Sequence, residues 1–129
     1  MVKLADLAAG AYWETTGLRL GGGEPPELIM EIREPVLQVY GKVHGGAVAG
    51  LIDSAIAVAV NSELPPEKGA ATVELKLNFL RPAAVGILRA RGELLSKGKL
   101  LLVGEGRAWD EDGHLVAVGI ATFRTFDMK

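Results

Sequence analysis

Residues 47–60, which read AVAGLIDSAIAVAV, decide the fold. Every residue in this stretch is apolar except Gly50, Asp53 and Ser54, so Asp53 is its single charge. A helix that is apolar nearly all round is expected to be enclosed by other structure rather than to lie on a surface. Burying an unpaired carboxylate is costly, so Asp53 is expected to be paired, protonated or retained for function.

The boundaries of this helix are marked on both sides. The turn signal VHGG, residues 43–46, comes directly before it, and the helix is predicted to run from Gly45-Gly46 to about Ser62. Pro65-Pro66 then closes it, because proline cannot continue a helix.

Upstream of the helix, the predicted elements are short and are separated by turns. A short amphipathic helix is predicted over residues 4–15, ending near Gly17. Residues 21–26, GGGEPP, predict a turn rather than a phosphate loop, since no buried strand precedes them and two prolines follow. Residues 28–33 alternate as a strand does, until Pro35 interrupts the pattern. Trp13 is interpreted as a packing residue, as is Trp109.

Downstream, the chain is predicted to be all strand. The expected strands cover residues 72–79, 87–95, 100–109 and 115–126. The turns at 96–99 and 111–113 contain Gly98 and Gly113, where a positive φ is expected. Gly104 and Gly106 lie within a strand pattern and predict a bulge. The order of helix, two strands, buried helix and four strands indicates an α+β fold, an antiparallel sheet curled around one long central helix, in a single domain over residues 1–129.

Composition narrows the function classes. The chain has 129 residues, a net charge of −2 and no cysteine, which excludes disulfides and thiolate chemistry. Interspersed charges and few aromatic residues argue against nucleic-acid binding. His44 and His114 lie far apart without ligand spacing, so no metal is expected. The early Lys3 followed by Asp6 does not fit a signal peptide. The central helix is too short for a membrane span and carries a charge. A soluble cytoplasmic protein is therefore expected.

The start of the central helix carries the candidate chemistry. A helix N-terminus presents unpaired N–H groups and a partial positive charge. Gly45-Gly46 leaves those amides accessible, so the turn could donate an N–H to a developing oxyanion. Asp53 could supply the other half of an acyl transfer, as nucleophile or as general base for water.

Distance separates these two groups on one chain. Gly45 and Asp53 are eight residues apart on one helix, which is roughly 12 Å along its axis. That span is too long for both to touch one carbonyl group. An isologous homodimer with antiparallel central helices would bring Gly45 of one subunit near Asp53 of the other, twice.

Two motifs resemble a known family. The run VHGGAVAGLIDSAIAVAVNS, followed by TVELKLNFLRPA, is similar to the hotdog-fold acyl-CoA thioesterases. The resemblance covers residues 18–126. It is strongest to the branch that contains the phenylacetate-pathway (PaaI-like) thioesterase and the human mitochondrial-associated thioesterase.

The resemblance implies hydrolysis of an acyl- or aryl-CoA thioester to free acid and coenzyme A. Coenzyme A is then part of the substrate, no separate cofactor or metal is implied, and coenzyme A binds across a homodimer, with a dimer of dimers left open. Gln38 stands where the family often has an asparagine, and Thr72 stands where a Ser or Thr helps to place the attacking water. The predicted catalytic residues are Gln38, His44, Gly45, Asp53 and Thr72. The predicted substrate-binding residues are Gly46, Asn61, Arg81 and Lys99.

Plainer structural roles stay open for several of these residues. Asp53 could be a structural acid paired with Ser54. His44 could cap the helix start, and Asn61 with Ser62 could cap its end. Thr72 is in phase with Glu74 and Lys76 in the sequence, which would make it a solvent-facing strand residue.

Two other functions also stay open. An acyl-CoA hydratase or dehydratase would need a histidine and an acid at the substrate's α and β carbons, and this chain has His44 and Asp53. It lacks the proline-rich histidine loop, the later helical glutamate and the Asp-to-His spacing of those enzymes. A non-catalytic acyl-CoA-binding protein is the third possibility, although no DNA-binding segment accompanies the domain.

Overall fold

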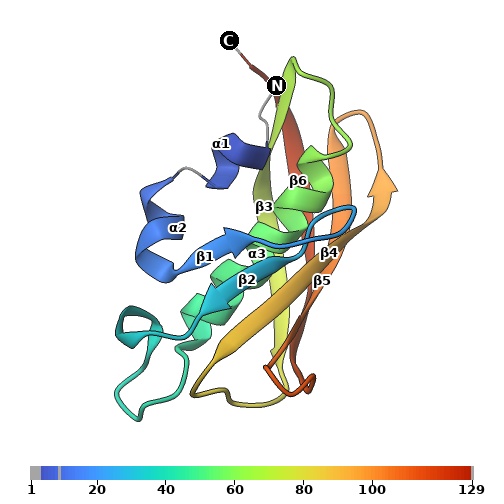
Figure 1. Ribbon diagram of the computed structural model, residues 1–129. Helices are drawn as coiled ribbons and strands as arrows, with labels where there is room; N and C mark the ends of the chain where they lie inside the picture. The colour runs from blue at the N-terminus through green and yellow to red at the C-terminus, as the bar shows by residue number, and fades with distance from the viewer. Residues whose placement is uncertain (1–3, 9, 129) are drawn as a thin grey trace.

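The computed structural model describes residues 4–8 and 10–128. Two short helices open the chain, and a long helix and a six-stranded sheet follow (Figure 1). In chain order, the elements are α1 (Leu4–Ala8), α2 (Ala11–Thr16), β1 (Leu18–Leu20), β2 (Leu28–Glu31), the 3-10 helix η1 (Glu34–Val36), α3 (Gly45–Asn61), β3 (Lys68–Phe79), β4 (Ile87–Lys97), β5 (Leu101–Trp109) and β6 (Leu115–Asp127).

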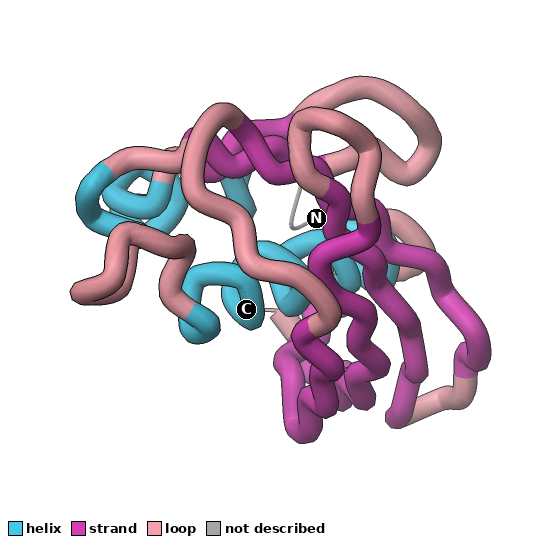
Figure 2. Tube along the Cα trace, turned by 90° about the horizontal axis from the view of Figure 1, so that it is seen from below, coloured by secondary structure: helices cyan, strands magenta, loops and turns pink. Residues whose placement is uncertain are grey.

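The sheet is antiparallel and curls around α3. Its strands lie in the order β1-β2-β4-β5-β6-β3, so β1 and β3 form the two edges. Seen along the molecule, α3 lies inside the curve of the strands (Figure 2). The predicted α+β class, with an antiparallel sheet around one long helix, is therefore confirmed.

Glycines on the inner face of the sheet let α3 approach closely. A Cβ at Gly92 would lie 2.3 Å from the Ala55 carbonyl oxygen, and one at Gly104 would lie 2.7 Å from Ile56 Cγ2. Gly104 and Gly106 pair regularly with β6, but the register with β4 shifts next to Gly104, where Leu95 of β4 is an extra residue. The predicted bulge thus occurs beside Gly104, on the partner strand rather than at the glycines themselves. They are small because the helix packs directly on them.

A bulge does occur in β3. Thr72 pairs with Phe123, whereas Glu74 pairs with Thr122, so Val73 is an extra residue between them. Phe123 is fully buried on the inner face. The bulge therefore places Thr72 on the face of β3 that is turned toward α3, and Glu74 on the opposite face. The interpretation of Thr72 as solvent-facing in phase with Glu74 is wrong for this reason.

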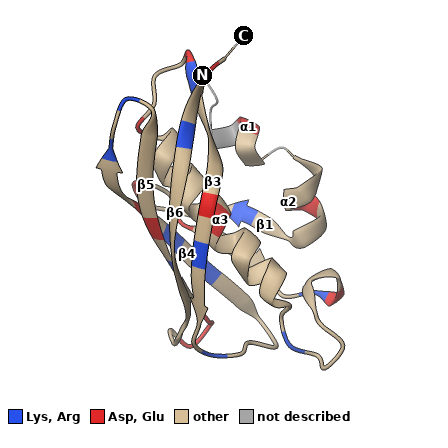
Figure 3. Ribbon diagram, turned by 180° about the vertical axis from the view of Figure 1, so that it is seen from behind, with Lys and Arg blue, Asp and Glu red and all other residues tan. Residues whose placement is uncertain are grey.

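The outer face of the sheet is polar. Positions of Lys and Arg and positions of Asp and Glu are interspersed along its strands (Figure 3). Ion pairs among the described residues of this face include Arg107–Glu105 at 2.9 Å and Arg89–Glu27 at 2.6 Å, and Arg91 also pairs with Glu27 at 3.7 Å. The strands therefore bury one face on α3 and present the other to water, as antiparallel sheets commonly do.

The start of the chain differs in detail from the prediction. The single helix over residues 4–15 is two helices separated near Gly10, and the second ends at Gly17 with φ 76°, as predicted. The strand pattern did not reveal β1, and β2 ends at Glu31 before the 3-10 turn that contains Pro35. Trp13 is buried in the core, which confirms its packing role.

The long helix has the predicted limits. Asn61 Nδ2 and Ser62 Oγ donate to the carbonyls of Ala57 and Val58, which confirms that they cap the helix end. At the hairpins, Gly113 has the expected positive φ of 84°, but Gly98 is not in the positive-φ region, so that prediction is wrong. None of the helices in the described part of the chain is long and apolar enough to cross a membrane.

One stripe of α3 remains open. Small residues spaced three or four apart, together with Asp53, are only partly covered by the sheet: Gly46, Ala49, Gly50, Asp53 and Ala57. The expectation of a helix enclosed on all sides is therefore wrong for the single chain, because the curled sheet leaves this stripe uncovered.

Candidate active site

The start of α3 leaves one backbone donor available. His44 is the N-cap, and its Nδ1 accepts a hydrogen bond from the Gly46 N–H at 2.8 Å. The N–H groups of Ala47 and Val48 donate to the His44 carbonyl. The Gly45 N–H has no acceptor among the described residues, so it is the donor that can serve a ligand. The capping role considered for His44 is confirmed.

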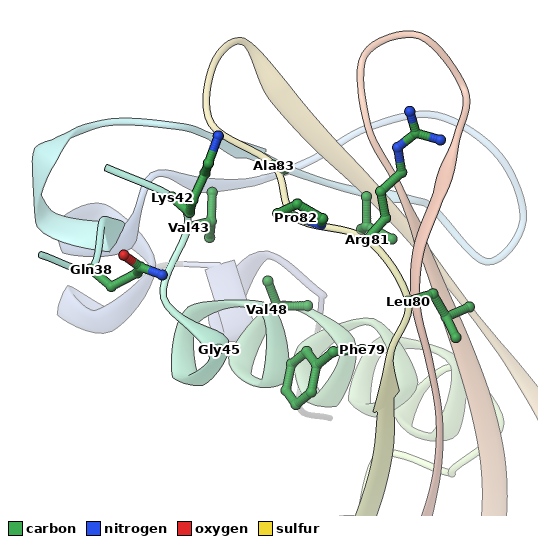
Figure 4. Close-up of a pocket in the computed structure, with 11 residues that line it drawn as sticks. Gln38, Lys42, Val43, Gly45, Val48, Phe79, Leu80, Arg81, Pro82 and Ala83 are labelled. Atoms are coloured by element: carbon green, nitrogen blue, oxygen red, sulfur yellow. The ribbon is translucent and has the colours of Figure 1, made fainter. Parts of the chain in front are cut away.

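A pocket of about 370 Å³ lies at this end of the helix (Figure 4). Its lining is mostly apolar, and its basic side chains are Lys42 and Arg81. Phe79 forms one wall, and a Cβ at Gly45 would lie 3.6 Å from its Cζ. The other lining residues are Gln38, Val43, Val48, Leu80, Pro82, Ala83 and Val116. An apolar pocket with a few polar groups and a backbone donor suits an organic anion or a polarised carbonyl.

The Gln38 side chain reaches this pocket with one end of its amide already engaged. Its Oε1 accepts a hydrogen bond from the Tyr40 N–H at 2.7 Å, which closes the loop before the helix. The nitrogen of the amide points toward the chain that leads to Gly45 (Figure 4). Gln38 can therefore stabilise the loop and donate into the pocket at the same time.

Asp53 lies two turns along α3 in a different environment. The residue is partly buried, and the Thr72 hydroxyl donates to its Oδ1 at 2.7 Å. Among the described residues, Thr72 is its only hydrogen-bond partner, so pairing with Ser54 is not observed. One hydroxyl on one oxygen orients the carboxylate and leaves the other oxygen open for chemistry.

Tyr12 also stands beside Asp53, and no sequence motif pointed to it. A Cβ built on Gly50 would lie 1.9 Å from Tyr12 Oη, so the phenol rests on α3 one turn before Asp53. Burial raises the pKa of Tyr12, and the negative charge of Asp53 raises it further. A glycine in the middle of an apolar helix was the available signal, because glycine is unfavourable there without a packing reason.

The two chemical groups remain separate within one chain. Gly45 lines the pocket, whereas Asp53 does not. Of the predicted substrate-binding residues, Arg81 lines the pocket and the Gly46 N–H is used by His44. Asn61 is buried at the far end of α3. Lys99 belongs to the β4–β5 turn near that same end, where the Lys97 ammonium donates to the Glu63 carbonyl.

A second group of ligand-type side chains lies in the β5–β6 turn. Donor atoms of Asp110, Asp112 and His114 all lie within 4.8 Å of one another. Asp110 Oδ1 accepts hydrogen bonds from the backbone N–H groups of Asp112 and His114. The bond from the His114 N–H is the largest cause of the lowered pKa of Asp110. The turn's own backbone therefore accounts for this cluster.

Comparisons with known proteins agree with the fold. The model of the thioesterase superfamily matches residues 40–117. A protein of Saccharolobus solfataricus that is named as an esterase is 33% identical over 96 residues, which cover 74% of this chain and 63% of that relative. The chain thus spans less than two thirds of that relative's length.

Two crystal structures superpose closely. A phenylacetic acid degradation-related protein of Ralstonia eutropha JMP134 is 30% identical, with a TM-score of 0.82, and 90% of each chain is covered. A protein of Bacillus halodurans, solved with CoA, is 29% identical with a TM-score of 0.85, covering 92% of this chain and 77% of its own. The family model covers more than half of the chain, and the curled sheet around one helix is the same in these structures. The chain therefore belongs to the thioesterase superfamily and has its hotdog fold.

Proposed function

We propose that this protein is an enzyme that hydrolyses acyl-CoA thioesters to a free acid and coenzyme A. The observation that carries the proposal is the unused Gly45 N–H at the mouth of an apolar pocket. A backbone donor at a helix start is suited to the oxyanion that forms when a thioester carbonyl is attacked. The relative from Bacillus halodurans was solved with CoA, which supports this substrate class.

The chemistry assigns one role to each end of the site. The thioester carbonyl oxygen accepts a hydrogen bond from the Gly45 N–H, which polarises the carbonyl. Asp53 either attacks the carbonyl carbon to form an acyl-aspartyl intermediate, or takes a proton from a water that attacks it. The C–S bond breaks in either case, the thiolate leaves and takes up a proton, and water supplies the hydroxyl of the acid. Thr72 orients Asp53, and His44 positions the helix start.

The proposed working unit is a homodimer that shares its two sites. Gly45 and Asp53 lie roughly 12 Å apart along one helix, so one chain cannot bring both to one carbonyl. The open stripe of α3 and the long edge strand β3 are surfaces that a second copy can cover. Val73 and Phe79, both more than half exposed, lie on that edge strand.

The pocket is the proposed binding region for coenzyme A. Arg81 lines it and can bind a phosphate, and the free end of the Gln38 amide can donate to the pantetheine chain. With antiparallel α3 helices, the end of α3 that carries Asn61 extends past the partner's Gly45. The β4–β5 turn lies at that end, so Lys99 is proposed to reach the coenzyme A of the partner's pocket.

The test is a thiol-release assay with short, long and aryl acyl-CoAs, run with wild-type protein and with Asp53→Ala. We expect release of coenzyme A by the wild type and near-complete loss in the variant. Hydration of crotonyl-CoA is followed in parallel, because a hydratase would add water without releasing thiol. Retained acyl-CoA binding without either reaction, or normal turnover by folded Asp53→Ala protein, would contradict the proposal.

A further inference from the structure

The short helix α2 holds Tyr12 on the open stripe of α3. Trp13, the next residue, is buried in the core and anchors the helix, whereas Tyr12 is half exposed. The Arg33 guanidinium donates to the carbonyls of Glu14 and Thr15, both at 3.2 Å, and fixes the end of α2. Tyr12 is therefore presented by a helix that the core and Arg33 hold in place.

Gly50 provides the seat for the phenol. A Cβ at Gly50 would lie 1.9 Å from Tyr12 Oη and 3.2 Å from its Cζ. Any side chain at this position would displace the ring. Glycine is unfavourable inside a helix, so a packing reason is required, and the Tyr12 hydroxyl supplies it.

Gly50 and Asp53 lie on the same face of α3, because residues three apart on a helix are neighbours. The phenol that rests on Gly50 therefore borders the space in front of the Asp53 carboxylate. The effect of the Asp53 charge on the phenol agrees with this closeness. The Tyr12 ring is thus a wall of the site, on the chain that carries the carboxylate.

The position of the pocket indicates which part of the substrate meets this wall. The basic groups Lys42 and Arg81 line the Gly45 pocket, whereas Tyr12 does not line it. A thioester carbonyl held between Gly45 and Asp53 has its sulfur on the side of the pocket. Its acyl carbon chain then extends on the side of Asp53, toward Tyr12.

We propose that Tyr12 is a specificity-determining residue, whose ring seated on Gly50 limits the bulk of the acyl group beside Asp53. This inference rests on the proposed thioesterase function. It assigns the acyl side of the site to a residue of the N-terminal helices, 41 positions before Asp53 in the chain.

The experiment compares kcat/KM for butanoyl-CoA and decanoyl-CoA in wild-type protein, Tyr12→Ala and Tyr12→Phe. Tyr12→Ala removes the ring, so the ratio of kcat/KM for decanoyl-CoA to kcat/KM for butanoyl-CoA should rise about tenfold or more. Tyr12→Phe keeps the ring, so its ratio should stay within about twofold of wild type. Glu14→Ala is the matched control, since it truncates an exposed side chain of the same short helix.

Gly50→Ala tests the seat itself. The added methyl collides with Tyr12 Oη and moves the ring, so the ratio should change by more than about twofold. In the double variant Gly50→Ala/Tyr12→Phe, the nearest ring atom is Cζ at 3.2 Å, and the ratio should return toward wild type. This return would not occur if the two residues acted independently.

The outcomes separate the two levels of inference. If the wild type releases thiol but Tyr12→Ala and Gly50→Ala lower both rates equally, Tyr12 is only structural and the inference is overturned. If the wild type releases thiol from no acyl-CoA, the proposed function fails, and the inference fails with it. Thermal unfolding of each variant shows that the compared proteins are folded.

Discussion

The two ends of the candidate site are built in different ways. The helix start relies mainly on backbone groups. The Gly45 N–H is free, the neighbouring Gly46 N–H is capped by His44, and a pocket lies against Phe79. The carboxylate end uses side chains from three separate elements, Asp53 on α3, Thr72 on β3 and Tyr12 on α2, and Asp53 does not line the pocket at the helix start.

This difference indicates that each end is incomplete without the other. The helix start can hold a carbonyl but offers no nucleophile. The carboxylate end has an oriented acid but no oxyanion donor. Since both lie on one rigid helix, joining them requires a second chain, and the experiments below test that requirement from the largest expected effect to the smallest.

Removing the carboxylate should have the largest effect. Asp53→Asn and Asp53→Ala should lower kcat/KM by about a hundredfold to ten-thousandfold, because the acid acts directly on the reacting atoms. Its single hydrogen bond, from Thr72, contributes little to the fold, so the free energy of unfolding should change by less than about 1 kcal/mol. Steady-state thiol release and thermal unfolding check both values. A loss of activity that tracked unfolding would argue against the catalytic role.

Removing the backbone donor should have the next largest effect. Gly45→Pro deletes the free N–H at the first position of the helix, where proline is well tolerated. His44 has φ −61° and ψ 137°, a conformation that a following proline permits. The rate should fall by on the order of a hundredfold, the usual effect of losing one oxyanion donor.

Gly45→Ala is the matched control for that variant. It keeps the N–H and places a Cβ in ordinary contact with Phe79, at 3.6 Å. Its loss of activity should be much smaller than that of Gly45→Pro. Equal losses in the two variants would show that space at position 45, and not the donor, is what the site needs.

Mixing the two inactive chains tests whether the ends work in different subunits. In a mixed dimer, the Asp53→Ala chain supplies an intact Gly45, and the Gly45→Pro chain supplies an intact Asp53. Half of the randomly mixed dimers then carry one complete site, so activity should recover to about a quarter of wild type. If both ends acted within one chain, refolded mixtures would stay as inactive as their parents.

The contact between Thr72 and Asp53 should contribute less. Thr72→Val removes the hydroxyl with little change of shape, so the carboxylate loses its orientation but keeps its place. We expect a decrease in kcat of about tenfold, with KM nearly unchanged. Thr122→Val, on the outer face of the neighbouring strand β6, is the matched control and should keep full activity.

The smallest effect concerns the phenol of Tyr12. In a Tyr40→Phe background, it should titrate above the usual value near 10. Asp53→Asn should lower this pKa only in part, because burial is its main cause. Because folding raises the pKa of this phenol, its contribution to stability is fully present at pH values below its pKa in the unfolded chain. That contribution is lost as the pH rises through its pKa in the folded protein. Phenolate absorbance measures the titration. If the titration curve of Tyr12 were the same with and without Asp53→Asn, the charge of Asp53 would not act on this phenol.

The sequence predicted the helix start well because its signals are local. His44, Gly45 and the apolar run lie within a few residues of one another, and caps and helix limits depend on such short spacings. The four long strands and their hairpins were predictable for the same reason. The distance between Gly45 and Asp53 follows from helix geometry alone.

The carboxylate end was less predictable because tertiary contacts define it. The alternation of residues 72–79 places Thr72 with Glu74, and only the pairing with β6 reveals the extra residue between them. Tyr12 lies in a region that was predicted to be helical, but its contact is with Gly50 across the fold, which no local pattern reveals. Gly104 and Gly106 were assigned to a bulge because the closeness of α3 is not visible in one strand.

The bulge at Val73 shifts the inward–outward alternation of side chains in β3 by one residue. Downstream, the strand is held in place by Leu75, Leu77 and Phe79, whose partners lie on the inner face of β6. Deleting Val73 would join the two halves in one regular register and keep Thr72 opposite Phe123, on the face turned toward α3. If Val73 were instead retained without the bulge, it would take the place opposite Phe123, and Thr72 would turn to the outer face, away from Asp53. The bulge is therefore a one-residue offset that brings the Thr72 hydroxyl to Asp53 while the downstream half of the strand keeps its own apolar face on the core.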